Sequence, residues 1–388
     1  MPERVFLIAL TLLLSAFMLG CTGAVRPKEP DMIDLYVSGT EGYHTHRIPS
    51  IVCTPRGTLL AIAEGRVGKR NDHAENDLLV KRSKDNGETW GPMQIIVEDG
   101  VNALVDPSTV VIGETGRVIV LYARYPQGFH HNKVVPGYDK EPIVRHFIVH
   151  SDDEGATWSQ SREITHSVKR STTIGSNFTP GIGHQLRRGK NAGRLLVPLW
   201  QYDPKKDHFT VCAAISDDLG DSWFLSQNIP EGSKGQADEA QVVQLIDGSI
   251  LLTSRSYRGN KVRKVSHSFD GGLTFAPLRD EPALIEPECQ GSILRYTDPL
   301  DGYRSRILLV NPASQKQREN GTVRLSYDEG KTWPVTKTLY PGLYAYSCLV
   351  VLPDKSIGCL FERDDYQKIT FARFTLDWLT DGKDRLTK

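Results

Sequence analysis

The chain has 388 residues, with 47 basic and 47 acidic side chains and a formal net charge of zero. This balance excludes a basic stripe for nucleic acid and an acidic tail, so partners must be inferred from local sites. The sequence contains no Cys-x-x-Cys, His-Glu-x-x-His or glycine-rich phosphate loop, and therefore predicts neither a metal site nor a nucleotide cofactor. Apart from Cys21, the cysteines lie mostly in apolar runs and are expected to be buried thiols.

The first residues predict export. An apolar run at residues 5–20 is short for a transmembrane helix and typical of a signal peptide. A small residue followed by Cys21 resembles a bacterial lipoprotein processing site. A lipid anchor on Cys21 predicts the cell envelope, in the periplasm or at the outer membrane, and ordinary secretion is the alternative. The chain is divided into a signal, a tether and a folded domain, at residues 1–21, 22–33 and 34–388.

One eight-residue pattern, Ser-x-Asp-x-Gly-x-Thr/Ser-Trp/Phe, occurs five times, starting at residues 83, 151, 216, 268 and 326. The mean spacing of about 61 residues is typical of one four-stranded propeller blade with its loops. Ser and Asp side chains can bind the backbone of a turn, Gly allows a positive φ, and the aromatic residue can anchor the turn on the sheet. Each repeat is therefore predicted to be a hairpin turn in which the Asp is structural.

Short apolar runs that follow turn residues predict strands throughout the chain, and no long amphipathic helix competes with them. Dividing the length from Asp34 to Lys388 by the repeat spacing gives about six units. The predicted fold class is all-β, a six-bladed β-propeller of four-stranded antiparallel blades. Residues 33–37 are expected to complete the last blade and close the ring.

The segment His46-Arg47-Ile48-Pro49-Ser50 lies upstream of the first repeat. It resembles the Arg-Ile-Pro motif of sialidases, which are six-bladed propellers with these repeats, called Asp boxes. From about Asp34 onward the chain thus resembles the bacterial exo-α-sialidases, or neuraminidases, although that family more often has Tyr or Phe at the position of His46. The resemblance implies a glycoside hydrolase that acts on sialylated glycans without a cofactor.

The resemblance also implies a cluster of three arginines. Sialic acids carry a carboxylate on the anomeric carbon, and fixed guanidinium groups bind carboxylates well. Arg47 is taken as the first, Arg255 as the second and Arg318 as the third. Three neighbouring arginines are rivals of Arg318: Arg304, Arg306 and Arg324.

A tyrosine is implied as the nucleophile, because an anionic nucleophile would meet the substrate carboxylate at the reacting carbon. Sialidases use a Tyr activated by a Glu, an exception to the two-carboxylate scheme of glycosidases. Tyr346 matches the family segment, and Tyr344, expected on the same strand face, is its competitor. Glu239 matches the activating base because Gln241 follows at the expected step, and Asp238 is a rival.

A general acid must protonate the leaving oxygen, and the family takes it from a loop before the first repeat. Asp72 is favoured in that loop, with Glu75 and Asp77 as alternatives. Arg66 resembles a family arginine that lines the pocket near the ring substituents. Glu362 resembles a glutamate that holds the first arginine of the cluster in place.

These residues predict a retaining exo-α-sialidase that forms a tyrosyl-enzyme intermediate. Its expected partners are sialylated glycoproteins, glycolipids including gangliosides, and oligosaccharides, with no nucleic acid, and it is expected to be a monomer. Two alternatives remain open. One is a sialoglycan-binding surface protein that has lost catalysis, and the other is a trans-sialidase.

Overall fold

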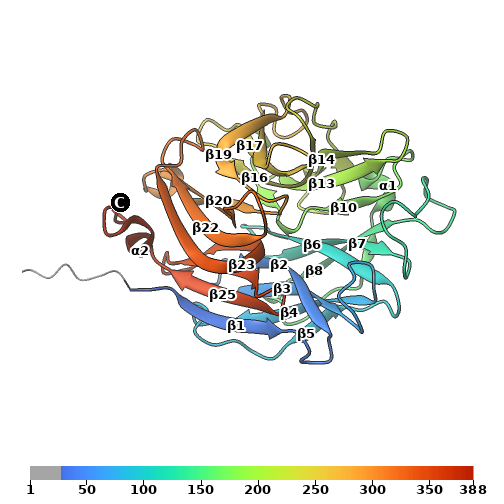
Figure 1. Ribbon diagram of the computed structural model, residues 1–388, viewed down its shortest axis with the longest axis horizontal. Coiled ribbons are helices and arrows are strands. Elements are labelled where there is room, and N and C mark those ends of the chain that lie inside the picture. Colours follow the sequence, from blue (N-terminus) through green and yellow to red (C-terminus); the bar gives the residue numbers. More distant parts are fainter. Residues whose placement is uncertain (1–27, 388) are drawn as a thin grey trace, which may run out of the picture.

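The computed structural model describes residues 28–387, and its architecture is all-β (Figure 1). The predicted signal at residues 1–21 and the first part of the tether lie outside the described residues. β1 (Asp31–Val37) starts three residues before Asp34, the expected start of the folded domain. Within the described part of the chain, no helix has both the length and the apolar character needed to cross a membrane.

In the described chain the strands form sheets of seven, five, nine and four strands, built mostly from antiparallel pairs of strands that follow one another in sequence. Strands such as β3 are buried along their whole length because neighbouring sheets cover both faces. The nine-stranded sheet contains two successive groups of four strands. The first group is β2 (Thr45–Cys53), β3 (Leu59–Arg66), β4 (Asn76–Ser83) and β5 (Gln94–Val97), and the second is β6 (Ala103–Val111), β7 (Val118–Tyr125), β8 (Arg145–Ser151) and β9 (Arg162–Glu163). The pairing of β4 with β6 joins the two groups.

The following groups of strands repeat this arrangement, with short additional strands in the third group. The third contains β10 (Ser176–Phe178), β12 (His184–Gln185), β13 (Leu195–Asp203), β14 (His208–Ser216) and β15 (Phe224–Leu225), while β11 (Gly181–Ile182) pairs with β6. The fourth contains β16 (Gln236–Gln244), β17 (Ile250–Tyr257), β18 (Val262–Ser268) and β19 (Arg279–Ile285). The last strands are β20 (Ser292–Thr297), β21 (Arg306–Pro312), β22 (Glu319–Ser326), β23 (Val335–Val351), β24 (Ile357–Arg363) and β25 (Lys368–Phe374).

β23 is long enough to serve two sheets. Its first half pairs with β22, and its second half pairs with β24. β1 pairs antiparallel with β25 and completes this last sheet, as the sequence predicts for residues 33–37. The N-terminal strand therefore lies beside the C-terminal strands (Figure 1), which protects the edge of the sheet.

The eight-residue repeats form the predicted turns. In the first, Ser83 Oγ donates to Asp85 Oδ1 at 2.7 Å and accepts from the Gly87 N–H at 3.0 Å, while Asp85 Oδ1 accepts from the Thr89 N–H at 2.9 Å. The other four repeats have the same three contacts. The Asp carboxylates are therefore engaged within the turns themselves.

The first repeat also packs against the last sheet. Gly87 has a φ of 81°, and a Cβ there would lie 2.3 Å from a ring carbon of Phe371 in β25. Trp90 packs on the same ring, with centroids 5.2 Å apart. Only glycine tolerates both this backbone conformation and this close approach. The repeat thus joins the beginning of the fold to its end.

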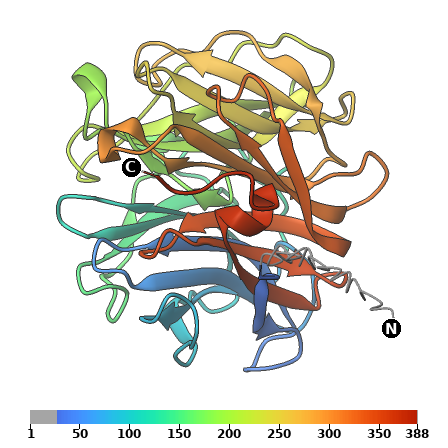
Figure 2. The ribbon, with the colours of Figure 1, turned by 90° about the vertical axis from the view of Figure 1, so that its left-hand side faces the viewer.

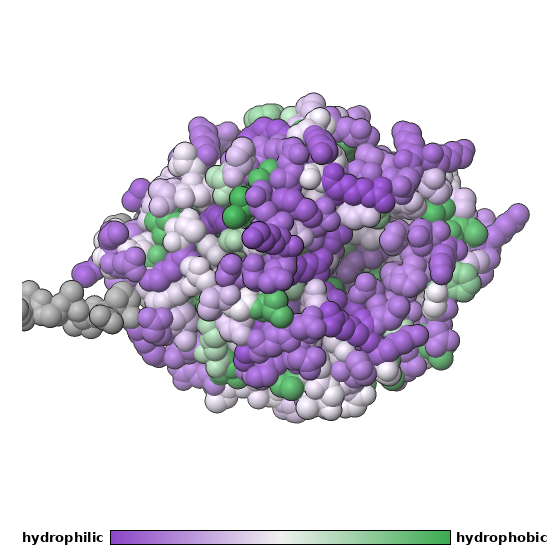
Figure 3. Space-filling view, viewed as in Figure 1, coloured by the Kyte–Doolittle hydropathy of each residue, from purple (hydrophilic) through white to green (hydrophobic). Residues whose placement is uncertain are grey.

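Two short helices, α1 (Thr165–Val168) and α2 (Leu376–Thr380), accompany the sheets. α2 lies on the outside of the last sheet, facing the viewer in Figure 2, and buries Leu376, Trp378 and Leu379. The face shown in Figure 3 is largely hydrophilic and has a hollow, and its apolar residues are scattered. The five cysteines in the described range are free, and all but Cys53 are buried.

Candidate active site

The site is built on irregular segments of the innermost strands. β2, β6, β16 and β23 each contain a register shift in their pairing with the next strand. Such β-bulges change the direction of side chains and are common next to active sites. Ile48 and Asp106 have positive φ values of 60° and 55° at these shifts, which is uncommon outside glycine. Residues in or beside the shifts include Arg47, Asp106, Asp238, Glu239 and Tyr346.

Glu362, on β24, holds Arg47 at the start of β2. Arg47 Nε donates to Glu362 Oε1 at 2.6 Å, and Nη2 donates to Oε2 at 3.2 Å. Glu362 also accepts from the backbone N–H groups of Ile48 at 2.8 Å and Tyr346 at 3.1 Å. Burial disfavours the charge on Arg47, but the Glu362 carboxylate outweighs burial and raises the pKa of Arg47. Glu362 therefore fixes both the arginine and the backbone at Tyr346.

Arg255 reaches three groups from β17. Its Nε donates to Asp238 Oδ1 at 2.9 Å, and its Nη1 lies 3.0 Å from Glu239 Oε2 and donates to the Tyr346 hydroxyl at 3.1 Å. Asp238, which is 1% exposed, also accepts from the Glu239 N–H at 2.7 Å. Asp238 thus orients Arg255, whereas Glu239 contacts the tyrosine.

Arg318 lies just before β22, with its Cζ 5.3 Å from the centroid of the Tyr346 ring. Nη2 donates to the Glu288 carbonyl at 2.9 Å, and Nη1 donates to the Tyr366 hydroxyl at 3.1 Å. Within residues 28–387, Arg318 forms no ion pair with a carboxylate. Its three rivals have partners elsewhere: Arg304 lies over Tyr327, Arg306 binds Asp384 and Arg324 binds Asn311.

Tyr346 and Glu239 share a short hydrogen bond, in which Tyr346 Oη donates to Glu239 Oε1. Burial and the neighbouring Glu239 carboxylate raise the pKa of Tyr346 well above its usual value, so the phenol is neutral at rest. Burial also raises the pKa of Glu239, although Arg255 opposes that shift. This geometry allows the phenol proton to move to Glu239 while the oxygen attacks a substrate.

Tyr344 differs from the expectation that it shares a strand face with Tyr346. Side chains two residues apart normally lie on one face of a strand, but the register shift between Tyr344 and Ser347 breaks this alternation. The Tyr344 ring is fully buried and stacks on Phe361 with centroids 4.8 Å apart. Tyr344 therefore belongs to the core.

Asp72 lies in the turn between β3 and β4, beside two arginines. Its Oδ1 accepts from Arg66 Nη1 at 2.6 Å and lies 3.6 Å from Arg47 Nη1. Partial burial would raise the pKa of Asp72, but Arg66 and Arg47 outweigh burial and lower it to about 2. Its side chain is 64% exposed and open to a ligand. Neither Glu75 nor Asp77 forms an ion pair with these arginines in the described chain.

Arg66 is 1% exposed and connects Asp72 to Glu64, whose Oε2 accepts from Arg66 Nη2 at 2.8 Å. Glu64 Oε1 in turn accepts from the Asp106 N–H at 2.8 Å. The structure thus places Arg66 behind Asp72, where its charge controls the ionisation of that carboxyl group.

Asp106 is a residue of the site that the sequence analysis missed. It accepts a hydrogen bond from Asn177 Nδ2 at 2.5 Å. Burial raises its pKa well above the usual value, and the nearby Glu64 and Glu239 carboxylates raise it further. The sequence contained a signal for this position, because the dipeptide Pro-Ser that follows Asp106 also ends the Arg-Ile-Pro-Ser segment at residues 47–50. Both segments lie at the equivalent bulge of an inner strand.

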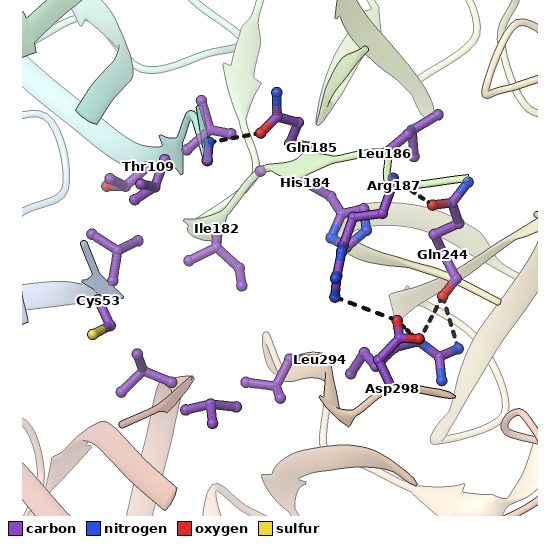
Figure 4. A pocket seen from close by; sticks show the side chains of 18 of the residues that line it. Cys53, Thr109, Ile182, His184, Gln185, Leu186, Arg187, Gln244, Leu294 and Asp298 are labelled. Carbon is purple, nitrogen blue, oxygen red and sulfur yellow. Dashed lines mark hydrogen bonds and ion pairs between the residues drawn. The ribbon is translucent and has the colours of Figure 1, made fainter. Parts of the chain in front are cut away.

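A cavity of about 800 Å³ lies at the other end of the same strands (Figure 4). Cys53 and Gln244, the last residues of β2 and β16, line it. Apolar side chains such as Ile182 and Leu294 point into it, with Arg187 at one side. None of the site residues predicted from the sequence lines this cavity. The structure brings all eight of those residues together at the opposite end of the strands.

Comparison with known proteins identifies the family of the chain. The model of the BNR repeat-like domain matches residues 57–359. The sialidase of Micromonospora viridifaciens is 37% identical over 357 residues, which cover 89% of this chain and 54% of that protein. Sialidase-2 of Mus musculus is 30% identical over 369 residues, which cover 86% of this chain and 93% of that protein. The chain belongs to the sialidase family of BNR-repeat proteins.

The sialidases are glycoside hydrolases, and this sialidase-family chain shares their fold. The solved structure of the Hadza microbial sialidase Hz136 superposes with a TM-score of 0.81 at 27% identity, covering 90% of this chain and 69% of that one. The chain spans about half the length of the Micromonospora sialidase. Between residues 28 and 387, no group of three or more His, Cys, Asp or Glu side chains is arranged to hold a metal ion.

Proposed function

We propose that the protein is a retaining exo-α-sialidase, which releases terminal sialic acids from glycoproteins, glycolipids and oligosaccharides through a tyrosyl-enzyme intermediate. The observation that carries this proposal is the Tyr346–Glu239 hydrogen bond among three arginines. A tyrosine bound to a buried carboxylate supplies a nucleophile and its base. The surrounding guanidinium groups supply a receptor for an acidic sugar.

Arg47, Arg255 and Arg318 bind the substrate carboxylate in this scheme. The Cζ atoms of Arg47 and Arg318 each lie 5.3 Å from the centroid of the Tyr346 ring, and Arg255 donates to its hydroxyl at 3.1 Å. A carboxylate among these three groups has its anomeric carbon beside the phenol oxygen. These three guanidinium groups, called the carboxylate clamp below, thus supply the affinity for the acidic sugar.

In the first step, Tyr346 Oη forms a bond to the anomeric carbon while its proton passes to Glu239. The bond from that carbon to the glycosidic oxygen breaks, and Asp72 protonates the leaving oxygen. In the second step, Asp72 takes a proton from water and the water oxygen attacks the same carbon. The bond from that carbon to Tyr346 Oη breaks, and Glu239 returns the proton to Tyr346. Two displacements at one carbon retain its configuration.

Substrate binding assists the protonation of Asp72. The nearby Arg66 and Arg47 hold the pKa of Asp72 at about 2 when the site is empty, so this carboxyl group is then ionised. A substrate carboxylate that binds Arg47 offsets one of these positive charges. The pKa of Asp72 then moves upward, which favours the acidic form needed to protonate the leaving group.

The direct test is release of free sialic acid from 3′-sialyllactose by the purified protein. The proposal expects hydrolysis by the unchanged protein and none by Tyr346→Phe. Binding of sialic acid without release would instead support a sialoglycan-binding protein. Excess lactose added to a reaction on a different sialoside distinguishes a trans-sialidase from a hydrolase, because a trans-sialidase would make sialyllactose.

We also propose that the sheets form six blades around one axis, with β23 contributing to two of them. The pairing of β1 with β25 supports closure of that ring. For the segment outside the described residues, the apolar run before Cys21 supports export to the cell envelope with a lipid anchor on Cys21, and we propose that the protein is a monomer. A Cys21→Ser variant, compared by membrane fractionation, tests the anchor.

A further inference from the structure

Tyr366 lies in a strained turn beside the site, and neither the motifs nor the catalytic scheme uses it. The turn joins β24 to β25, and three successive residues, Asp364, Asp365 and Tyr366, have φ values of 54°, 54° and 64°. Left-handed backbone is unfavourable for residues other than glycine. Strain of this kind persists where surrounding contacts hold it, and it gathers at ligand sites.

Ion pairs hold the turn in this conformation. Arg363 Nη1 donates to Asp364 Oδ2 at 2.6 Å, and the guanidinium of Arg70 binds both oxygens of Asp365 at 3.1 Å. Asp365 thus ties the turn to the loop that carries Asp72. The result of this geometry is that the Tyr366 ring is directed toward the arginines of the site.

Three guanidinium groups surround the Tyr366 side chain. Arg47 Cζ and Arg70 Cζ each lie 4.1 Å from its ring centroid, and Arg318 Nη1 donates to its hydroxyl at 3.1 Å. A cation over an aromatic face is attracted by the electron density of the ring. Two of these cations, Arg47 and Arg318, also flank Tyr346.

We propose that Tyr366 is a positioning residue of the carboxylate clamp, which fixes Arg47 through its ring and Arg318 through its hydroxyl before the ligand arrives. Arg47 is also held by Glu362, but Arg318 has no carboxylate partner in residues 28–387. Among side chains, the Tyr366 hydroxyl alone receives a hydrogen bond from Arg318 there. A guanidinium with few fixed contacts loses more freedom on binding a ligand, so orienting it beforehand improves affinity.

This inference rests on the proposed function and concerns the binding step. Tyr366 packs against the apolar cluster that includes Tyr346, but its polar contacts go to the arginines and it forms no hydrogen bond with Tyr346 or Glu239 in residues 28–387. Its loss should therefore weaken binding of the carboxylate and leave the chemical step largely intact. The dissociation constant and KM are expected to rise, while kcat changes little.

Two variants of Tyr366 separate its ring from its hydroxyl. Tyr366→Phe keeps the ring and removes the hydrogen bond to Arg318. Tyr366→Asn removes the ring, and asparagine tolerates left-handed backbone better than most residues, so the turn is expected to survive. Tyr340→Phe is the matched control. The Tyr340 hydroxyl donates to Asp364 of the same turn, and Arg363 Cζ lies 5.5 Å from the centroid of its ring, but Tyr340 does not reach the three arginines of the clamp.

Calorimetry with 2-deoxy-2,3-dehydro-N-acetylneuraminic acid and with its methyl ester measures the effect on the carboxylate. For the acid, we expect a loss of affinity of roughly tenfold in Tyr366→Asn and a smaller loss in Tyr366→Phe. The ester should show little change, and Tyr340→Phe should bind both ligands as the unchanged protein does. Thermal melting of each variant shows that the fold is retained.

Equal affinities in all proteins, or equal losses for acid and ester, would overturn the role of Tyr366. A tenfold fall in kcat at unchanged KM would also overturn it, because the residue would then act on the chemical step. If the unchanged protein binds neither the acid nor a sialoside, the proposed function itself fails. The two failures are therefore distinguishable.

Discussion

The two ends of the innermost strands carry similar residues in different electrostatic arrangements. At the end shown in Figure 4, each arginine has a carboxylate partner: Arg187 binds Asp301 at 2.7 Å, Arg188 binds Asp298 at 2.8 Å and Arg295 binds Glu329 at 2.6 Å. Burial raises the pKa values of Asp298, Asp301 and Glu329, but the hydrogen bonds that these arginines donate outweigh burial and lower all three values. These acids are stabilised in their ionised form.

At the end that holds the candidate active site, charges and partners do not match one to one. Arg318 has no carboxylate partner, and Asp106 has no cationic partner, within the described residues. Burial raises the pKa values of Glu239, Asp106 and Tyr346. Groups perturbed in this way are poised to exchange protons. The cavity in Figure 4 is thus a region of paired ions, whereas the candidate active site of the described chain holds charges without matching partners.

The largest expected effect is that of Tyr346→Phe, which removes the proposed nucleophile from the candidate active site. The variant should lose roughly 10³- to 10⁶-fold in kcat on a fluorogenic sialoside, since catalytic groups that act as a unit fail together. Tyr344→Phe is the control, because Tyr344 lies two residues away in the core. Near-normal turnover by Tyr346→Phe would show that Tyr346 is not the nucleophile.

Asp72→Asn should have the next largest effect, and the effect should depend on the leaving group. General acid catalysis is worth roughly 10²- to 10⁴-fold, and an alcohol needs protonation more than a phenol does. We therefore expect a large loss of kcat with 3′-sialyllactose and a much smaller loss with a 4-nitrophenyl sialoside. Equal losses on both substrates would contradict the role of Asp72.

Arginine substitutions compare the two ends directly. Arg318→Ala removes a charge-assisted contact to the substrate, which corresponds to a rise in KM of roughly 10- to 100-fold. Arg187→Ala, in the opposite cavity, should leave KM and kcat within about twofold. Steady-state kinetics on one sialoside suffices. The contrast fails if Arg187→Ala raises KM as much as Arg318→Ala does.

The pH dependence provides a smaller effect. Glu239 must be ionised to accept the phenol proton, and burial raises its pKa in the folded protein. As the pH falls through this raised value, Glu239 becomes protonated and kcat/KM should fall. The acidic limb should thus lie above the ordinary glutamate value of about 4.3. A limb at or below that value would show that the base is not the buried carboxylate described here.

The repeats predict the strands and turns well because serine, aspartate and glycine determine a turn locally. Single residues such as Arg47 and Tyr346 could be assigned only through the family resemblance, and the structure brings them together. Asp106 was missed because its environment depends on a bulge and on two carboxylates that are distant in sequence, those of Glu64 and Glu239. The placement of Tyr344 and the turn at Tyr366 could not be predicted from the sequence for the same reason. Tertiary contacts set both the register shift beside Tyr344 and the left-handed backbone at Tyr366.

The most direct test of the central claim uses 2,3-difluorosialic acid, whose fluorine slows release of a covalent intermediate. The protein is incubated with it, digested with protease and analysed by peptide mass spectrometry. Loss of fluoride from the anomeric carbon should leave one added 3-fluorosialosyl group on Tyr346, and no adduct is expected in Tyr346→Phe. An adduct on Asp72 or Glu239, or turnover of the compound without any adduct, would contradict the tyrosyl-enzyme intermediate.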